Sequence, residues 1–306
     1  MVKKAENIIV GISVGDLNGI GSEVILKTFE DIRMLELCTP VIFANVKILS
    51  FLKKEFNLAA AIHGIDKLDQ LVVGKINVLN VWREGVNLEF GKNDDVVGGY
   101  AVKSFIAATN ALKDGFVDVL VTAPINKYNI QSDDFKFPGH TDYLNKELTG
   151  DALMLMVHDD LRVGLLTDHV PVNEVAKNLT ERLILSKIQT VIKTLKQDFE
   201  IEKPKIAVLG LNPHSGDNGV IGDEEEKIMK PALKKLFEAG NLVFGPFSAD
   251  GFFGSSQYEK YDAVIATYHD QGLIPFKTLS FGTGVNYTAG LDKIRTSPDH
   301  GTAYEI

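Results

Sequence analysis

The sequence predicts an α/β fold in which mostly parallel sheets are covered by helices. Two observations lead to this expectation: short apolar runs recur along the whole chain, and longer amphipathic stretches alternate with them. The short runs are rich in Val, Ile and Leu and are seldom interrupted by polar residues, which is typical of strands buried on both faces. Regular alternation of the two element types is typical of the α/β class.

The expected strands, in chain order, are Ile8–Val14, Pro40–Ala44, Ile76–Val81, Val117–Thr122, Leu153–Val157, Val163–Thr167, Lys205–Leu211 and Ala263–Thr267. The expected helices are Ser22–Phe29, Gly99–Lys113, Leu179–Gln197 and Glu224–Ala239, because their apolar residues recur with a helical period. No Pro/Ser-rich linker or internal repeat separates these elements. A chain of this length usually forms more than one lobe, so we expect lobes joined by crossing strands, with boundaries near residues 130 and 270.

Charge and composition exclude several classes of function. The 306 residues include 32 Lys and Arg against 41 Asp and Glu, a formal net charge of −9. Such an acidic surface repels nucleic acid and anionic membranes, so an anionic ligand needs a local cluster of positive groups. The apolar runs are too short for membrane helices, and no signal-peptide cleavage site follows the first of them. The single cysteine, Cys38, suits a reducing compartment, so we expect a cytoplasmic protein.

Three histidines follow three of the expected strands within a few residues. His169 comes after Val163–Thr167, His214 after Lys205–Leu211 and His269 after Ala263–Thr267. Parallel strands deliver such positions to one edge of a sheet, where ligands bind in open α/β folds. Imidazoles suit zinc and other first-row divalent ions, and three of them leave coordination positions open for substrate. The alternative is that each histidine only ends a strand or packs in a loop.

Two further segments carry groups that could bind an anion. In FPGHT, a Pro-Gly turn precedes His140 and Thr141, and the following helix would add its free backbone N–H groups. Lys277, Asn286 and Arg295 lie in the Gly-rich carboxy-terminal run and could bind a phosphate or carboxylate. The alternatives are a simple helix cap by Thr141 with an incidental histidine, and ordinary solvated surface charges.

Two glycine-rich segments carry weaker signals. Gly15–Glu23 joins the first strand to a helix and could approach a phosphate, although it matches neither the dinucleotide-binding nor the P-loop pattern. A tight turn explains it equally well. Ser215–Glu225 is expected to be mainly a loop and a helix N-cap, in which Asp223 precedes the acidic residues of the first helical turn.

Seven ordered motifs then point to one family. They are VTAPINK, FPGHT, LLTDHVPV, GLNPHSGDNGVIGDEE, YHDQGLIPFK, GVNYTAG and IRTSPDHGTAYEI. Over essentially its whole length the chain resembles the 4-hydroxythreonine-4-phosphate dehydrogenases of vitamin B6 biosynthesis. One loop departs from the family pattern: the family usually has GDPAGIGPE where this chain has GDLNGIGSE, so that Leu17, Asn18 and Ser22 differ.

The resemblance implies an isopropylmalate-dehydrogenase-like fold of two lobes, with the active site in a central cleft. Residues 1–130 and 270–306 would form the cofactor-side lobe, and residues 131–269 the lobe of the metal and the dimer interface. The family is homodimeric with a shared active site, so one metal-binding histidine would come from the other subunit. No nucleic acid or membrane partner is implied.

The resemblance also implies a role for each candidate residue. By resemblance, His169, His214 and His269 would hold one divalent ion (Zn, Mg or Co), with Asp250 and Asp270 nearby. His140, Thr141, Lys277, Asn286 and Arg295 would bind the phosphorylated substrate. Gly301, Thr302 and Ala303 would contact NAD or NADP, because DHGTAYEI is similar to the adenosine-binding loop of the isopropylmalate dehydrogenases.

The implied reaction is the oxidation and decarboxylation of 4-phosphooxy-L-threonine to 3-amino-2-oxopropyl phosphate. The group that takes the hydroxyl proton stays open among a metal-linked water, Asp270 and Lys277. The nearest alternative is a paralogue that oxidises 4-phospho-D-threonate or erythronate. More distant alternatives are a non-catalytic phosphometabolite sensor and a phosphate acyltransferase, which needs neither metal nor nicotinamide.

Overall fold

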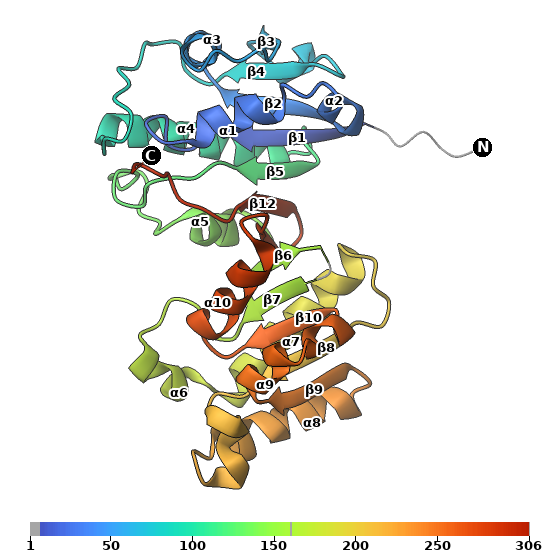
Figure 1. Ribbon diagram of the computed structural model, residues 1–306. Coiled ribbons are helices and arrows are strands. Elements are labelled where there is room, and N and C mark those ends of the chain that lie inside the picture. Colours follow the sequence, from blue (N-terminus) through green and yellow to red (C-terminus); the bar gives the residue numbers. More distant parts are fainter. Residues whose placement is uncertain (1–6, 160, 306) are drawn as a thin grey trace, which may run out of the picture. The chain divides into compact units, whose positions relative to one another are not determined.

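The structure of this chain is a computed structural model that describes residues 7–159 and 161–305. These residues form two compact units (Figure 1). Unit 1 runs to Thr149 and resumes at Asp292, and unit 2 spans Gly150–Leu291. Both ends of the chain thus lie in unit 1. Strands β6 (Gly150–His158) and β11 (Val285–Leu291) pair with each other inside unit 2.

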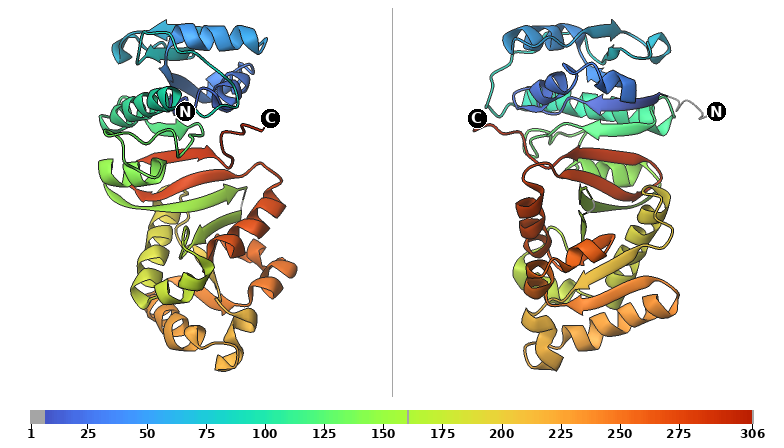
Figure 2. Two further views of the ribbon diagram at one scale, coloured as in Figure 1. Left: turned by 90° about the vertical axis from the view of Figure 1, so that its left-hand side faces the viewer. Right: turned by 45° about the vertical axis from the view of Figure 1, so that its right-hand side comes forward.

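Unit 1 contains a parallel sheet with strand order β3-β4-β2-β1-β5-β12. The strands are β1 (Ile8–Ser13), β2 (Cys38–Ala44), β3 (Ile62–Ile65), β4 (Ile76–Asn80), β5 (Val119–Thr122) and β12 (Ile294–Pro298). Its longer helices are α1 (Gly21–Thr28), α3 (Val46–Glu55), α4 (Asp95–Lys113) and α5 (His140–Glu147), with the short α2 (Met34–Leu37) and η1 (Leu68–Gln70). Helices α4 and α1 cover opposite faces of this sheet (Figure 2). Burial is deepest in the central strand β2, where Val41, Ile42 and Phe43 are completely buried, as a sheet covered on both faces requires, whereas Ile8 at the start of β1 is 48% exposed.

Unit 2 contains a mixed sheet with strand order β11-β6-β7-β10-β8-β9. Strands β7 (Leu161–Leu165), β10 (Ala263–Ala266), β8 (Lys205–Leu209) and β9 (Leu242–Phe247) are parallel, whereas β6 pairs antiparallel with both β7 and β11. The expected strand Leu153–Val157 therefore exists but is not part of the parallel set.

The helices of unit 2 lie on both faces of its sheet. Helices α7 (Glu181–Gln197) and α8 (Lys230–Glu238) lie on one face and α10 (His269–Ser280) on the other (Figure 2). The remaining helical segments are α6 (Val175–Asn178), α9 (Ala249–Gly254), η2 (Val172–Glu174), η3 (Pro213–Gly219), the π-helical turn η4 (Glu225–Met229) and η5 (Gln257–Lys260). The expected helix Glu224–Ala239 is thus divided between η4 and α8.

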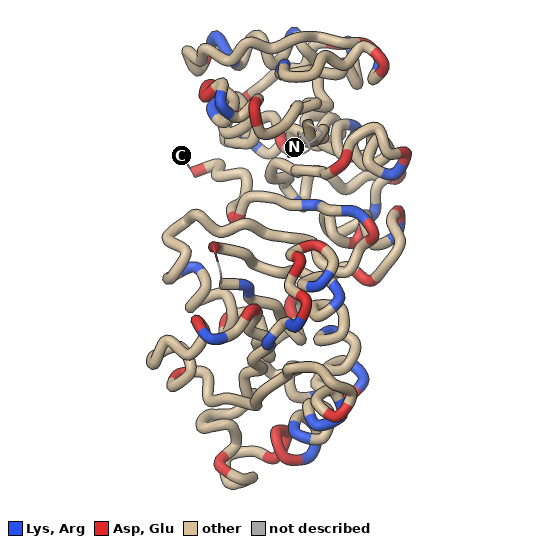
Figure 3. The backbone as a smooth tube through the Cα atoms, turned by 90° about the vertical axis from the view of Figure 1, so that its right-hand side faces the viewer, with Lys and Arg blue, Asp and Glu red and all other residues tan. Residues whose placement is uncertain are grey.

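The α/β class and the predominance of parallel pairing are confirmed. Acidic and basic residues are interspersed along the surface helices (Figure 3), as in the ion pair of Lys235 with Glu181 at 2.6 Å. Among the described residues, no helix is both long and apolar enough to cross a membrane.

Candidate active site

The strands that precede the three candidate metal-binding histidines are neighbours. Strand β10 lies between β7 and β8 and is parallel to both (Figure 1). Their carboxyl ends therefore meet at one edge of the unit 2 sheet, as the sequence predicted. His169, His269 and His214 follow these ends in loops or at the start of a helix, and all three are at least partly exposed.

The side chains at this edge form one close pair of imidazoles. The ring centroids of His169 and His269 are 5.9 Å apart. His269 Nδ1 lies 2.8 Å from Asp270 Oδ1, which leaves the Nε2 atom of His269 as the nitrogen that could bind an ion. Asp250 accepts a hydrogen bond of 2.5 Å from Ser248. That bond, together with smaller effects that include the nearby His214, holds the pKa of Asp250 below its usual value.

The donor types at this edge fit a divalent ion, because imidazoles and carboxylates are the ligands of zinc and related metals. Within residues 7–159 and 161–305 of a single chain, however, no group of three His, Cys, Asp or Glu side chains is arranged to hold an ion. The described chain thus brings the rings of His169 and His269 close together, whereas His214 is not arranged with them as a third ligand.

A hydrogen-bond network, here called the strand-end frame, connects the three strand ends. Thr167 Oγ1 donates to the carbonyl of Thr267 at 2.6 Å, which joins the ends of β7 and β10. Gln271 Oε1 accepts from the backbone N–H of Thr267 at 2.7 Å, while its Nε2 donates to the carbonyl of Gly210 at 2.6 Å. The end of β8 is thereby joined to the end of β10. This frame fixes the backbone from which each histidine emerges.

A second group of candidate residues forms a positively charged corner in unit 1. Arg295 on β12 is buried, with 3% of its surface exposed. Its guanidinium donates to Thr122 Oγ1 from Nε at 3.1 Å and from Nη2 at 2.5 Å. Nη2 also lies 3.2 Å from His140 Nδ1. Burial lowers the pKa of Arg295 to about 10, so the guanidinium remains charged at neutral pH.

The contact with Arg295 decides where the proton of His140 lies. A guanidinium can only donate, so Nδ1 of His140 must accept and the proton of a neutral ring sits on Nε2. Burial first, then the positive charges of Arg295 and Lys127, hold the pKa of His140 well below its usual value. Among the described residues, the buried Nε2 atom has no hydrogen-bond partner. The corner therefore presents an N–H donor beside a buried cation, which is suited to an anionic oxygen.

The other predicted substrate residues are distributed between the units. Thr141 is the second residue of α5, and Gly139 occupies the N-cap position without a side-chain cap, so Thr141 is not the cap. Lys277 in the last turn of α10 and Asn286 on β11 belong to unit 2.

The predicted cofactor residues lie in a carboxy-terminal segment that is anchored on the glycine-rich loop. Thr302 accepts a backbone hydrogen bond of 3.0 Å from Ile20. A side chain at Gly19 would collide with the Thr302 carbonyl, which lies 2.7 Å from the ideal Cβ position. Tyr304 donates at 2.6 Å to the buried carboxylate of Asp16. Gly301 and Ala303 thus lie next to anchored residues, with Thr302 between them and Tyr304 after Ala303.

The sequence matches the family described as pyridoxal phosphate biosynthetic protein PdxA over residues 36–306. The chain belongs to the PdxA family. A relative named 4-hydroxythreonine-4-phosphate dehydrogenase from Bacteroides thetaiotaomicron is 46% identical over 97% of this chain and 82% of its own length. A relative from Clostridium botulinum, provisionally named D-threonate 4-phosphate dehydrogenase, is 32% identical over 97% of this chain and 90% of its own length.

Solved structures of PdxA-family proteins share the fold. The crystal structure of a 4-hydroxythreonine-4-phosphate dehydrogenase from Burkholderia phymatum is 33% identical, with a TM-score of 0.83 over 98% of this chain and 92% of that chain. A branched-chain phosphotransacylase from Enterococcus faecalis V583 has a TM-score of 0.52 at 14% identity, over 97% of this chain and 94% of that chain. That second likeness shows the fold alone.

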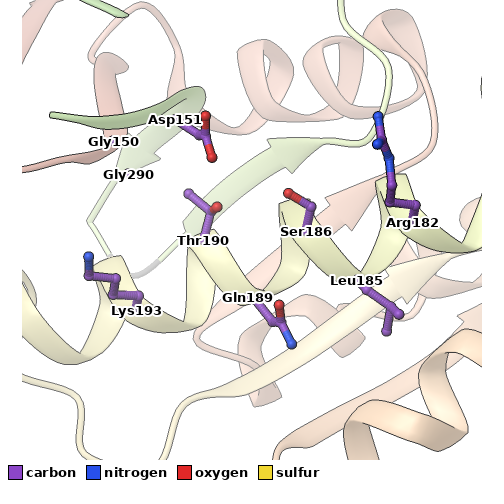
Figure 4. A pocket seen from close by; sticks show the side chains of 9 residues that line it. All are labelled: Gly150, Asp151, Arg182, Leu185, Ser186, Gln189, Thr190, Lys193 and Gly290. Atoms are coloured by element: carbon purple, nitrogen blue, oxygen red, sulfur yellow. The ribbon is translucent and has the colours of Figure 1, made fainter. Parts of the chain in front are cut away.

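A groove of about 460 Å³ in unit 2 of this PdxA-family chain (Figure 4) is lined by none of the predicted residues. It runs along α7 and is lined by Gly150, Asp151, Arg182, Leu185, Ser186, Gln189, Thr190, Lys193 and Gly290. Its two cationic residues, Arg182 and Lys193, lie about three helical turns apart along α7.

The structure adds several residues that the sequence reasoning did not single out. Thr122 and Lys127 join the corner, and both lie in or just after a buried strand, where ligand-binding residues of α/β sheets are found. Gln271 and Glu225 hold the histidine loops through backbone groups and Asn212. In the sequence these polar residues look like ordinary surface residues, and no local pattern marks them as functional.

Proposed function

We propose that this chain is an NAD(P)-dependent and divalent-metal-dependent dehydrogenase. It would oxidise 4-phosphooxy-L-threonine at the secondary alcohol, and the resulting 3-keto acid would lose CO2 to give 3-amino-2-oxopropyl phosphate in vitamin B6 biosynthesis. The observation that carries the proposal is the buried corner of Arg295 and His140, found in a chain that is 46% identical to a relative with this name.

The corner supports the phosphate-binding part of the proposal. A phosphate oxygen can accept from the His140 Nε2–H, which has no partner among the described residues, while the buried Arg295 supplies the positive charge. The corner gives an acidic protein the local positive charge that an anionic substrate requires. Thr141, Lys277 and Asn286 are proposed as the remaining substrate contacts, and binding through the phosphate would align the carbinol carbon.

His169, His214 and His269 are proposed to hold one divalent ion, with Asp250 and Asp270 beside them. When bound, this ion supplies Lewis-acid stabilisation of negative charge on the substrate oxygen, and the nicotinamide accepts the hydride. Asp270 contacts Nδ1 of His269 and so orients that ring. Asp270, Lys277 and a water molecule remain the candidates for accepting the hydroxyl proton.

Two features support a homodimer with a shared active site. One described chain brings the rings of His169 and His269 close together without completing a three-residue ion site. Exposed aliphatic side chains also follow each histidine: Val172 is 76% exposed, Val220 80% and Ile274 63%. Apolar side chains around a polar edge are typical of a surface that another chain covers.

The carboxy-terminal segment is proposed to contact NAD or NADP through Gly301, Thr302 and Ala303. Its support is the anchoring of this segment on the loop after β1, which keeps the backbone in one position. We propose a cytoplasmic location, because a chain with one cysteine, Cys38, forms no internal disulfide and so suits a reducing compartment.

The decisive experiment supplies purified protein with 4-phosphooxy-L-threonine or 4-phospho-D-threonate, each with NAD and with NADP in the presence of Zn²⁺, Mg²⁺ or Co²⁺. Nicotinamide reduction with release of CO2 from the amino substrate supports the proposal. Faster turnover of the threonate would assign the chain to the alternative activity of its Clostridium relative. No reduction with either substrate would remove the dehydrogenase proposal.

A further inference from the structure

The loop that carries His214 has an unusual backbone conformation. Six successive residues have positive φ angles: His214 (53°), Ser215 (53°), Gly216 (77°), Asp217 (42°), Asn218 (55°) and Gly219 (93°). Four of them are not glycine, and the left-handed region is unfavourable for residues that carry a side chain. Such a run persists only when the surrounding structure holds it.

The carboxylate of Glu225, which is completely buried, contacts the residue that leads into this loop. Its Oε1 accepts from the backbone N–H of Asn212 at 2.7 Å, and its Oε2 accepts from Asn212 Nδ2 at 2.9 Å, while Nδ2 also donates to Glu224 Oε2 at 2.7 Å. Asn212 directly precedes Pro213 and His214. The carboxylate thus fixes both the main chain and the side chain at the entrance to the left-handed run.

The packing around Glu225 leaves little freedom for this arrangement. A Cβ atom at Gly216 would lie 2.8 Å from Glu225 Oε2, and one at Gly222 would lie 2.3 Å from Asn212 Nδ2. Glu225 is also the first residue of the π-helical turn η4, a distortion that often occurs at functional sites. The left-handed run and the π-helical turn therefore both lie next to the buried Glu225 carboxylate.

We propose that Glu225 is a positioning residue that fixes the direction of the His214 imidazole by clamping Asn212 beneath the left-handed run. This inference rests on the proposed role of His214 at the histidine edge. It assigns Glu225 no contact with an ion or substrate. Through Gly210, which accepts from Gln271, the clamped loop is continuous with the strand-end frame.

The variant Glu225→Gln tests the clamp with a minimal change of shape. The new side chain keeps an oxygen for the Asn212 N–H, but its amide group faces the Asn212 Nδ2 donor, so one of the two bonds is lost. Glu226→Gln is the matched control, because it removes the same charge one residue along and disturbs only the surface pair with Lys230. Both proteins are studied as full-length chains.

Two measurements distinguish positioning from a merely structural role. Hydrogen exchange of residues 213–221 in metal-free protein should be faster by about tenfold or more in Glu225→Gln, because a buried hydrogen bond to a charged group is lost. The dissociation constant for Co²⁺, followed by its visible absorption spectrum, should rise by roughly 10–100-fold, as for other residues that orient metal ligands. Glu226→Gln should match the original protein in both measurements.

Unchanged exchange in Glu225→Gln would overturn the clamp. Faster exchange with an unchanged Co²⁺ affinity and spectrum would also overturn the inference, because Glu225 would then stabilise the loop without directing His214. If the original chain bound no Co²⁺ at all, the proposed metal centre would fail, and the exchange measurement alone would decide whether Glu225 holds the His214 loop.

Discussion

Replacing His140 with glutamine tests the electrostatics of the positively charged corner in unit 1. His140 is held neutral because burial and the cations Arg295 and Lys127 lower its pKa well below 6.5. In the unfolded chain the imidazole titrates near its usual value of about 6.5. Below that pH, the unfolded chain binds a proton that the folded chain excludes, so the free energy of unfolding decreases as the pH falls.

The size of this effect follows from the proton linkage. Between pH 7.5 and pH 5.5 the linkage removes at most about 1.4 kcal/mol of stability, the limit reached when the folded ring takes up no proton in that range. Glutamine keeps a neutral N–H donor but cannot take up a proton, so the His140→Gln variant lacks this contribution. The stability of the original protein relative to the variant should therefore decrease over that pH range, by up to about 1.4 kcal/mol.

Urea unfolding of both proteins at pH 7.5, 6.5 and 5.5 measures the difference directly, and the titration of the other groups cancels in the comparison. Curves that stay parallel across this range would refute the reasoning. They would mean that His140 takes up its proton equally well in the folded chain and that the corner is open to water.

Three further predictions concern the proposed binding groups. Arg295→Lys should raise KM for the phosphorylated substrate about tenfold or more with little change for the nicotinamide, because lysine lacks the fork that donates to two partners at once; an unchanged substrate KM would place the phosphate elsewhere. His214→Ala should keep its circular dichroism spectrum but lose Co²⁺ binding and turnover, and full activity in the presence of chelator would exclude the proposed metal role. Tyr304→Phe, which removes the bond to Asp16, should raise KM for the nicotinamide severalfold with kcat and substrate KM nearly constant; equal kinetics would separate this bond from cofactor binding.

The sequence predicted the strands that are continuous and apolar, and missed those that are not. β1 and β8 are mostly apolar runs rich in Ile and Val, and this pattern is sufficient to find them. β9 contains Gly-Pro, β12 ends in Ser-Pro and β3 has only four residues, so their sequences resemble loops. These strands exist because neighbouring strands supply hydrogen bonds, which is tertiary information that a local pattern does not contain.

The candidate site shows the same division between local and tertiary information. The position of histidines directly after apolar strands was readable, and the parallel pairing of those strands follows from the α/β pattern. The proton position on His140 was not readable, since it depends on Arg295, which is 155 residues away along the chain. Glu225 also has the sequence pattern of an ordinary acidic helix start, and only burial distinguishes it from Glu226.

The two sets of candidate residues differ in how their positions are maintained, and this difference predicts how each responds to mutation. In the corner, the functional groups themselves are buried, so a change at Arg295 or His140 alters both charge and packing, and ligand affinity and stability should change together. At the histidine edge, the imidazoles are at least partly exposed, and their positions depend on neighbours such as the half-buried Gln271 and the buried Glu225. Changes to the histidines should therefore remove function at little cost in stability, whereas changes to the buried neighbours should weaken ion binding and loosen the loops at the same time.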